Sequence, residues 1–547
     1  MKTAAGKTIQ NGIAIGPLRV CRREETQLCR TSALTPEEEW TRFTAACGEA
    51  RAQLAELYGK ALDRAGRDSA AIFEIHQMLL EDDDYLEAAR DLLETQGVSA
   101  AYAAIAAGER FAALFSAMED SYMRSRAADI EDVSRRVADI LTGKREPLPQ
   151  EGPPAILAAG SLTPGEAMAL DRSRLLGLVT RRGSENSHTA ILARAMGIPA
   201  LTGVDFDEGW DGRPAVLDGE RGCLCIDPDP DFLDAMRARQ TDALRQADRL
   251  RALRDLPSVT LDGREIRIYA NAGSVQDAAM ALDNGAQGIG LFRSEMLCLA
   301  SGSIPGEEQQ FAVYRQVVET MAGRRTVIRT LDAGADKHLP GLCGDKEENP
   351  ALGCRGIRAS LTRQDLFRQQ LRAVLRAAAF GPVAVMFPMI ASLWEVREAK
   401  ALLEACRAEL EAQGVAAGPV EVGIMVETPA AVVMAEELAE EADFFSIGTN
   451  DLTQYTLAAD RQNPGLERFC DPRHPAVLRM IRHTAEAAHR HGCQVGICGE
   501  LGADPALAED FLRMGLDSLS VAPSAVLPLR EYIRSLDLGR DAGPASQ

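Results

Sequence analysis

Apolar and polar positions change their spacing twice along the first half of the chain. Residues 12–20 (GIAIGPLRV) form a short apolar run rich in Ile and Val, which is typical of a strand. From about residue 35 to 143, Ala, Leu, Glu and Arg recur at helical spacing. Residues 150–228 return to short β-rich runs between Gly and Asp turns, with one clear helix. This order predicts an α/β domain with a helical module inserted after its first strand.

The second half alternates apolar runs with helical segments. A charged stretch without Pro or Gly, Asp231 to Leu256, comes first and predicts a semi-rigid helical connector. Eight strand-like runs follow, which predict a closed parallel (β/α)8 barrel with its active site at the carboxyl ends of the strands. The runs are residues 265–273, 288–295, 326–334, 383–390, 420–428, 444–451, 494–500 and 517–523.

These patterns divide the chain into five predicted parts. The fold class is α/β and multidomain, because 547 residues are too many for one hydrophobic core. The parts are residues 1–30 and 146–230 for the α/β domain, 31–145 for the inserted helical bundle, 231–256 for the linker helix and 257–540 for the barrel.

Composition and charge exclude several classes of function. The net charge of -21 repels nucleic acids and anionic lipids and favours a basic protein partner. No secretory signal is expected, and Pro and Gly interrupt the one uncharged stretch of near membrane-span length, Ala377 to Trp394. The cysteines lack zinc-site spacing and indicate reduced thiols in a cytoplasmic protein.

The ends of the predicted barrel strands carry a coherent set of polar residues. Two guanidiniums can hold a phosphate or carboxylate with paired hydrogen bonds, and Arg355, Arg358 and Arg461 follow in loops near the same rim. Two carboxylates among these arginines suit a hard cation such as Mg²⁺. The strand-end residues are Arg293, Arg329, Glu427, Asn450 with Asp451, and Cys498.

Each feature also has a structural interpretation. Glu427 and Asp451 could pair with arginines inside the barrel mouth, and a single buried cysteine such as Cys498 often fills apolar space. Residues 81–85, which include Tyr85, are expected to form a solvated helix end, and His76 is expected to pack at an interface.

A second candidate site lies in the α/β domain, at the start of a helix. Ser187 can cap this helix and His188 opens it, so a phosphate on the imidazole would lie near unpaired backbone N–H groups. A histidine at such a position can equally be structural.

Specific motifs in both halves resemble the Enzyme I family, the phosphoenolpyruvate-protein phosphotransferases of the bacterial sugar phosphotransferase system. The resemblance extends over essentially the whole chain. Its motifs are SHTAILARAMGIPAL around His188, GIGLFRSE at Arg293, IRTLDAGADK at Arg329, NPALGCRGIR at Arg355, GIMVETPAA at Glu427, FFSIGTNDLTQYTLAADR up to Arg461 and GICGE at Cys498.

The resemblance implies a two-step transfer from phosphoenolpyruvate. It implies that His188 is the nucleophile and Cys498 the proton donor to the enol carbon. It also implies that Glu427 and Asp451 hold Mg²⁺, and that the substrate is bound by Arg293, Arg329, Arg355, Asn450 and Arg461. A histidine phosphocarrier protein would dock on the helical module near residues 72–86, and the barrel would form a homodimer.

Departures and alternatives accompany this resemblance. Ser184 and Asn186 stand where the family usually has Gly and Thr before the histidine, and Ala335 replaces a common glycine. A dikinase of related architecture would need an ATP-binding domain ahead of the histidine, and the short helical first 145 residues do not suit one. A regulatory phosphoenolpyruvate-binding phosphoprotein, or a nitrogen-branch or other specialised paralogue, stays open. The sequence does not identify the carrier or the sugars served.

Overall fold

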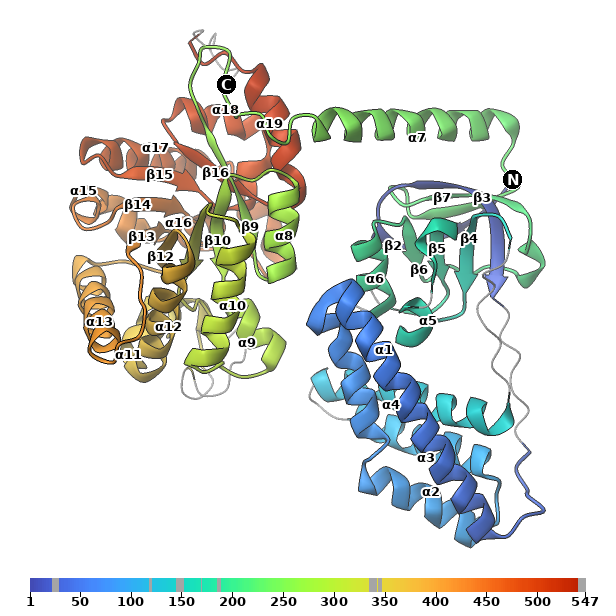
Figure 1. Cartoon of the computed structure of the whole chain (residues 1–547). Helices are drawn as coiled ribbons and strands as arrows, with labels where there is room; N and C mark the ends of the chain where they lie inside the picture. The colour runs from blue at the N-terminus through green and yellow to red at the C-terminus, as the bar shows by residue number, and fades with distance from the viewer. Residues whose placement is uncertain are drawn as a thin grey trace. The chain divides into compact units, whose positions relative to one another are not determined.

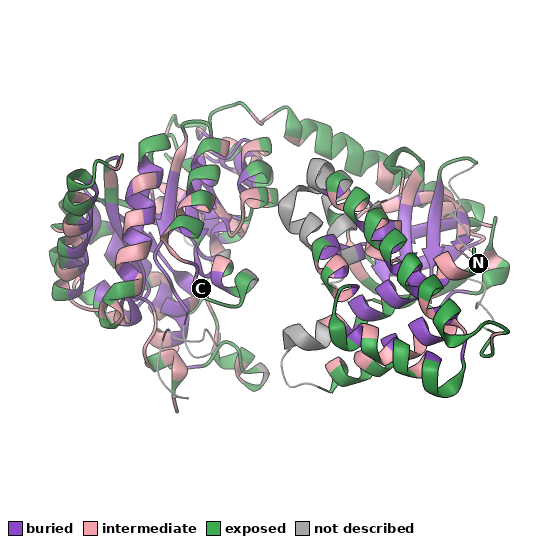
Figure 2. Cartoon of the chain, turned by 60° about the horizontal axis from the view of Figure 1, so that its bottom comes forward, coloured by how far each residue is buried: buried purple, intermediate pink, exposed green. Residues whose placement is uncertain are grey.

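The computed structural model describes two compact units, Met1–Arg245 and Gln246–Gln547 (Figure 1). The described residues are 1–21, 29–117, 121–143, 152–168, 170–183, 188–333, 342 and 347–539. Buried residues lie along the strands of both units, while the outward faces of the helices are exposed (Figure 2). In the described part of the chain, no helix is both long enough and apolar enough to cross a bilayer.

The first unit is built on an eight-stranded sheet in the order β1-β8-β7-β3-β4-β5-β6-β2. Strands β3 to β6 pair in parallel, and the remaining pairs are antiparallel. Alternate side chains of the sheet enter two apolar clusters, and helix α6 packs into one of them through Ala190 and Ala193. The strands are β1 (Lys2–Ala5), β2 (Lys7–Gln10), β3 (Ile13–Cys21), β4 (Ala155–Ala159), β5 (Leu175–Thr180), β6 (Ala200–Thr202), β7 (Pro214–Asp218) and β8 (Cys223–Ile226). The helical segments among them are α5 (Pro164–Met168), η1 (Arg172–Arg174), α6 (His188–Met196) and η2 (Glu208–Trp210).

Between β3 and β4 the described residues form four helices, so the predicted helical insertion is confirmed. They are α1 (Pro36–Leu79), α2 (Asp83–Gln96), α3 (Ala100–Ser116) and α4 (Ser121–Thr142). Helix α1 begins with a capping box, in which Thr35 and Glu38 satisfy each other's backbone N–H groups.

The expectation that residues 81–85 form a solvated helix end is wrong for one of these residues. Glu81, Asp82 and Asp83 are exposed and Asp82 caps α2, but Tyr85 is buried in the core of the module. Its ring packs near Phe43, and its hydroxyl accepts a hydrogen bond from Ser134 at 3.0 Å. Burial raises the pKa of Tyr85. The local pattern missed this contact because α4, which supplies Ser134, lies some 50 residues further along the chain.

The second unit is a closed barrel of eight parallel strands in the order β10-β11-β12-β13-β14-β15-β16-β9. The strands coincide with the predicted runs, so the predicted (β/α)8 fold is confirmed. The strands are β9 (Arg267–Ala272), β10 (Gly288–Arg293), β11 (Arg325–Arg329), β12 (Val383–Phe387), β13 (Val420–Val426), β14 (Phe444–Ile447), β15 (Gln494–Ile497) and β16 (Ser518–Val521).

Side chains of these strands alternate between the barrel interior and the surrounding helices. A small cluster that includes Leu291, Val327 and Met425 fills the interior, while neighbours such as Phe292 and Ile328 pack under the helices. The α-helices are α8 (Val275–Asp283), α9 (Glu295–Ser301), α10 (Glu307–Thr320), α11 (Ile357–Thr362), α12 (Gln364–Ala377), α13 (Leu393–Ala412), α14 (Pro429–Val433), α15 (Ala435–Ala439), α16 (Thr449–Leu457), α17 (Pro475–Arg490), α18 (Pro505–Arg513) and α19 (Val526–Ser535). Shorter 3₁₀ segments are η3 (Pro350–Leu352), η4 (Ala378–Phe380), η5 (Pro464–Phe469), η6 (Glu500–Ala503) and η7 (Pro523–Ala525).

Helix α7 (Pro230–Arg251) occupies most of the predicted connector. Met236 near its start is buried against the sheet of the first unit, and Arg239 pairs with the buried Asp218 at 2.7 Å. Residues 241–249 are exposed, and within this stretch Gln246 and Arg249 contact Glu531 of α19 through a hydrogen bond and an ion pair. The boundary between the compact units falls inside this exposed stretch. The finer domain limits at residues 30 and 145 stay predictions.

The buried Arg530 binds the segment after α7, residues 253–258, to the rest of the barrel unit. Arg530 of α19 is 1% exposed. Its guanidinium donates to the carbonyls of Leu253, Arg254 and Gly285 and to the hydroxyl of Ser258. Among the described residues no carboxylate forms an ion pair with it, so its role is to satisfy backbone carbonyls that would otherwise be buried without donors.

We therefore expect Arg530→Met to destabilise the barrel unit by about 3 kcal/mol, because it leaves several buried acceptors unpaired. Denaturant unfolding measures this effect, followed by the fluorescence of Trp394 in a chain in which Trp40 and Trp210 are replaced by Phe. Arg534→Met, which removes one bond to the Pro257 carbonyl from a less buried position on the same helix, is the matched control. Equal stabilities of the two variants would contradict the assignment.

Candidate active site

The carboxyl ends of the barrel strands bring together most of the residues expected from the sequence. Arg293 and Arg329 are the last residues of β10 and β11. Glu427 directly follows β13, Asp451 lies in the first turn of α16 after β14, and Cys498 directly follows β15. Because the strands are parallel and the barrel is closed, all five lie at one end of it.

Asp332, which sequence reasoning did not single out, forms ion pairs with two arginines at this end of the barrel. It is buried and pairs with two guanidiniums, that of Arg329 at 2.9 Å and that of Arg355 at 3.1 Å. Asp332 follows Arg329 by three residues in the TLDAG motif. The same strand-end argument that selects Arg329 could therefore have found it.

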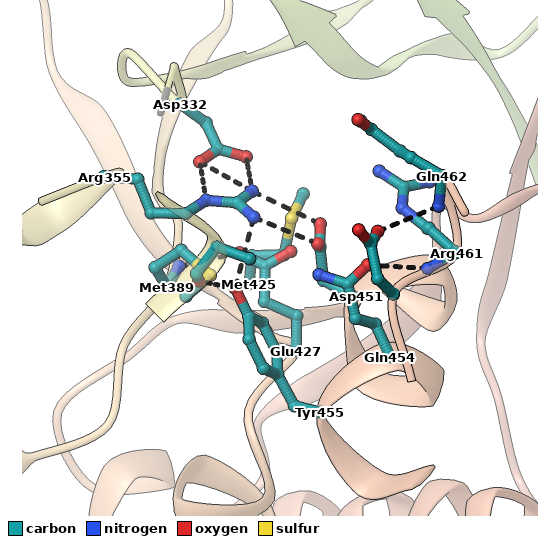
Figure 3. Close-up of polar contacts among 12 residues, drawn as sticks. Asp332, Arg355, Met389, Met425, Glu427, Asp451, Gln454, Tyr455, Arg461 and Gln462 are labelled. Carbon is teal, nitrogen blue, oxygen red and sulfur yellow. Dashed lines mark hydrogen bonds and ion pairs between the residues drawn. The ribbon is translucent and has the colours of Figure 1, made fainter. Parts of the chain in front are cut away.

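Arg355 lies between two carboxylates (Figure 3). Its Nη2 donates to both carboxylate oxygens of Asp332, each at 3.1 Å, and its Nη1 donates to Asp451 Oδ1 at 3.2 Å. Nη1 also donates to the hydroxyl of Tyr455 at 3.2 Å, and that hydroxyl donates to the carbonyl of Ala351. Burial lowers the pKa of Arg355, but Asp332 and Asp451 outweigh it, so the net pKa is raised and the group is a permanent cation.

Arg329 is also paired with Glu295, a second carboxylate that the sequence argument missed. Its Nη2 lies 2.5 Å from Glu295 Oε1, and both side chains are buried. Within the described residues, Arg329 Nε and Glu295 Oε2 have no hydrogen-bond partner. Arg329 therefore keeps one donor free in a buried position next to the cluster.

Three carboxylates at this end have the geometry of a metal site. Ligand oxygens of Asp332, Glu427 and Asp451 lie within 4.8 Å of one another, and all three residues are buried. Glu427 Oε1 accepts a hydrogen bond from the backbone N–H of Met389 at 2.7 Å. Burial, reinforced by the charges of Asp451 and Asp332, raises the pKa of Glu427 well above its usual value. Such a concentration of buried negative charge suits a hard divalent cation, which favours the ionised carboxylate.

Two glycines close to the carboxylates make room for this arrangement. A Cβ at Gly448 would lie 2.7 Å from Glu427 Oε2, so a larger residue would displace that carboxylate. Gly356 has φ of +56°, and a Cβ there would lie 2.8 Å from Met389 Cβ. Gly356 therefore lets the loop that carries Arg355 pack closely against the Met389 side chain.

Three of the predicted substrate-binding residues are open to a ligand. Arg293 and Arg461 are exposed and Asn450 is half-buried. Within the described part of the chain, none of these three side chains makes a hydrogen bond or an ion pair. The backbone N–H of Arg461 donates to Gln454 Oε1 at 3.2 Å, which places its loop beside α16 (Figure 3). The barrel end thus combines a buried group of carboxylates and arginines with two cationic side chains, Arg293 and Arg461, that have no ionic partner among the described residues.

Cys498 is buried at this end of the barrel, as a member of the interior apolar cluster. Its thiol lies 3.6 Å from the carbonyl of Ile447, and burial raises its pKa to about 11. The amide of Asn271 donates to the Cys498 carbonyl at 3.2 Å. The thiol is therefore protonated at neutral pH, and both the thiol and the backbone of Cys498 are held in place.

The histidine site lies in the first unit. Helix α6 begins at His188, as predicted, and ends where Gly197 adopts φ of +63°. The hydroxyl of Thr189 donates to the carbonyl of Leu162 at 3.2 Å. The predicted cap Ser187, together with Ser184, Asn186 and Ala335, lies outside the described residues, and so does the side chain of His188.

The structural alternatives for the barrel residues are partly realised. Asp451 does pair with an arginine, but Glu427 binds a backbone N–H instead. In the helical module, His76 is buried, with Nε2 3.4 Å from Asp129, so it packs inside the module and not at an interface as expected from the sequence.

Comparison with known proteins extends this picture to the whole chain. Three family models match: "PEP-utilising enzyme, N-terminal" over residues 5–126, "PEP-utilising enzyme, mobile domain" over 151–222 and "PEP-utilising enzyme, PEP-binding domain" over 247–538. The chain is 41% identical over 539 residues to the phosphoenolpyruvate-protein phosphotransferase of Bacillus sp. (strain S), covering 98% of this chain and 93% of that protein.

The chain belongs to the phosphoenolpyruvate-protein phosphotransferase family. Other members are similarly related: the Haemophilus influenzae protein is 42% identical over 533 residues, with 96% of this chain and 92% of that protein covered. The Staphylococcus carnosus protein is 38% identical over 540 residues, with 98% and 94% covered. The family assignment made from the motifs is confirmed, and the roles of individual residues stay predictions.

Proposed function

We propose that this chain transfers the phosphoryl group of phosphoenolpyruvate to its own His188 and then to a histidine phosphocarrier protein, with release of pyruvate. The reaction is the first step of sugar uptake by the phosphotransferase system. One observation carries the proposal: a buried group of three carboxylates at the barrel end lies among arginines, two of which have no ionic partner in the described residues. Such a site suits a small, highly charged anion together with a divalent cation.

In this proposal Glu427 and Asp451 hold Mg²⁺. Their oxygens are close enough to share one cation, and burial together with the charges of Asp451 and Asp332 raises the pKa of Glu427. When bound there, Mg²⁺ supplies positive charge to the phosphate oxygens. The protein's own part is to hold both carboxylates in position, Glu427 through the backbone N–H of Met389 and Asp451 through Arg355.

The arginines bind and orient the substrate. Arg293 and Arg461 are free to take the phosphate or carboxylate of phosphoenolpyruvate, and Asn450 can donate a hydrogen bond beside them. Arg329 is already fixed by Glu295 and Asp332, so it offers a preorganised positive charge to the transferring group. Arg355, in the loop between η3 and α11, is the remaining arginine of the proposed substrate site.

The chemical step forms one bond and breaks another. A neutral imidazole nitrogen of His188 attacks phosphorus, the bond from phosphorus to the enol oxygen breaks, and its electron pair remains on the enolate. The methylene carbon of the enolate then takes the proton of the Cys498 thiol, which yields pyruvate. The thiolate recovers a proton from water.

His188 must reach the barrel end and later present its phosphate to the carrier. We propose that α7 permits this movement, since residues 241–249 form an exposed stretch that contains the boundary between the units.

Four consecutive exposed acids, residues 81–84 of the helical module, would attract a basic carrier. A homodimer through the barrel and a cytoplasmic location, the first implied by the family resemblance and the second by the cysteine pattern, stay proposals.

A transfer assay tests the proposed function. The purified chain is incubated with ³²P-labelled phosphoenolpyruvate and Mg²⁺, the acid-labile label is mapped, and candidate carriers are then added. We expect label on His188 that passes to one carrier with the release of pyruvate. Label on another residue, or a phosphoprotein that passes label to no histidine carrier, would contradict the proposal.

Cys498→Ser separates phosphoryl transfer from protonation. A hydroxyl is a much weaker acid than the Cys498 thiol, so we expect enzyme-bound protonation to slow by about 100-fold or more while label still reaches His188. The variant should release enolpyruvate and lose stereochemical preference in the methyl group of pyruvate. Cys493→Ser, which changes a buried thiol just before β15, is the matched control. Wild-type rate and stereochemical purity in Cys498→Ser would show that another group is the acid.

A further inference from the structure

The guanidinium of Arg355 lies among the carboxylates of the proposed metal site (Figure 3). It contacts two of the three carboxylates that could hold a cation, Asp332 and Asp451, and Asp451 is one of the two predicted Mg²⁺ ligands. A guanidinium and a divalent cation compete for the same lone pairs of Asp451. Arg355 therefore has to give up part of this arrangement when a metal binds.

The two contacts of Arg355 are unequal. Three donor–acceptor distances join it to Asp332, at 3.1, 3.1 and 3.3 Å. Two join it to Asp451, at 3.2 and 3.5 Å, and the longer one is at the limit of a hydrogen bond. Asp332 is thus the stronger partner, and Asp451 is the one that Arg355 can lose at lower cost.

The backbone around Arg355 is held in place by contacts on both sides. Gly356 is confined by Met389, and the N–H of Ile357 donates to the carbonyl of Pro388 at 3.2 Å. On the other side, Tyr455 bonds the carbonyl of Ala351. A long side chain on an anchored loop can change one partner without moving the loop.

We propose that Arg355 is the internal counter-ion of the metal site: it neutralises Asp451 until a divalent cation arrives and is then released, still tethered by Asp332, to bind the anionic substrate. This inference rests on the proposed function for the metal ligands. It adds that metal and phosphoenolpyruvate reinforce each other's binding through one side chain. By thermodynamic linkage the reinforcement is equal in both directions.

The inference predicts opposite effects of one substitution on two affinities. Arg355→Gln removes the competing cation, so Mn²⁺, used as the probe metal without substrate, should bind more tightly. A cation next to a carboxylate changes its proton affinity by a factor of about 10 or more, so we expect a gain in Mn²⁺ affinity of about tenfold. Affinity for phosphoenolpyruvate at saturating Mn²⁺ should fall, and the factor by which the metal improves substrate binding should shrink.

The experiment uses the full chain at one fixed pH, with Mn²⁺ binding measured by electron paramagnetic resonance and substrate binding by calorimetry. Arg363→Gln, which removes an arginine paired with Asp365 outside the site, controls for net charge. Asp451→Asn, which should lose Mn²⁺ binding, shows that the probe reports this site. Arg355→Lys keeps a charge but cannot bridge two carboxylates in the same way, so its Mn²⁺ affinity should lie between those of wild type and Arg355→Gln. It provides a second variant if the first does not fold.

Mn²⁺ affinity that is unchanged or weaker in both folded Arg355 variants would overturn the inference. That result leaves the proposed function intact if the wild-type chain still phosphorylates His188. Conversely, a wild type that forms no phosphohistidine, with tighter Mn²⁺ binding in Arg355→Gln, would refute the function and support the counter-ion role. The two failures are therefore distinguishable.

Discussion

His188→Ala is expected to abolish formation of the phosphoprotein, with a loss of at least about 10⁴-fold in the rate of labelling, since removing a nucleophile removes the covalent pathway itself. Affinity for phosphoenolpyruvate should stay within about twofold of wild type, because the candidate substrate residues lie in the other compact unit and sites without shared partners act independently. A quenched-flow assay with labelled phosphoenolpyruvate measures the first effect, and calorimetry on the same protein measures the second.

A control for this variant removes another histidine. His483 is exposed on α17 of the barrel unit, and His483→Ala should label at the wild-type rate. Acid-labile label that persists on His188→Ala would refute the nucleophile assignment. Loss of substrate binding as well would show that His188 shapes the barrel site, contrary to the separation of the two sites.

The second large effect concerns the metal ligands. Asp451→Ala should lower phosphoryl transfer by about 1000-fold, since metal stabilisation of a transferring phosphate is worth several kcal/mol and each 1.36 kcal/mol is about a factor of ten. The substitution also removes one partner of Arg355, so the remaining charges at the barrel end rearrange. Single-turnover labelling of His188 over a range of Mg²⁺ concentrations measures the loss.

Chelation of the wild type should reproduce the defect of Asp451→Ala, and added Mg²⁺ should reverse only the chelated sample. Glu421→Ala serves as the matched control. Glu421 lies near the start of β13, at the opposite end of this strand from Glu427, and it pairs with Arg325. Transfer that continues undiminished in saturating chelator would show that Glu427 and Asp451 are structural.

The sequence alone determined the order and kind of the elements. The strands of the barrel are short buried runs, and their period and spacing are local properties that can be read from the chain. For the same reason the strand-end residues Arg329, Glu427 and Cys498 could be assigned to one end of the barrel from sequence position, since parallel strands share their direction. Family motifs then indicated the chemistry.

Tertiary structure decided which charges meet. Asp332 and Arg355 are separated by 23 residues, and Arg355 and Asp451 by 96. Nothing local in the chain indicates that one guanidinium bridges these two carboxylates. Glu295 against Arg329 and Tyr85 against Ser134 are further pairs of this kind. Periodicity reports which face of an element is buried, whereas the partner of a buried polar group depends on contacts between distant elements and exists only once the chain has folded.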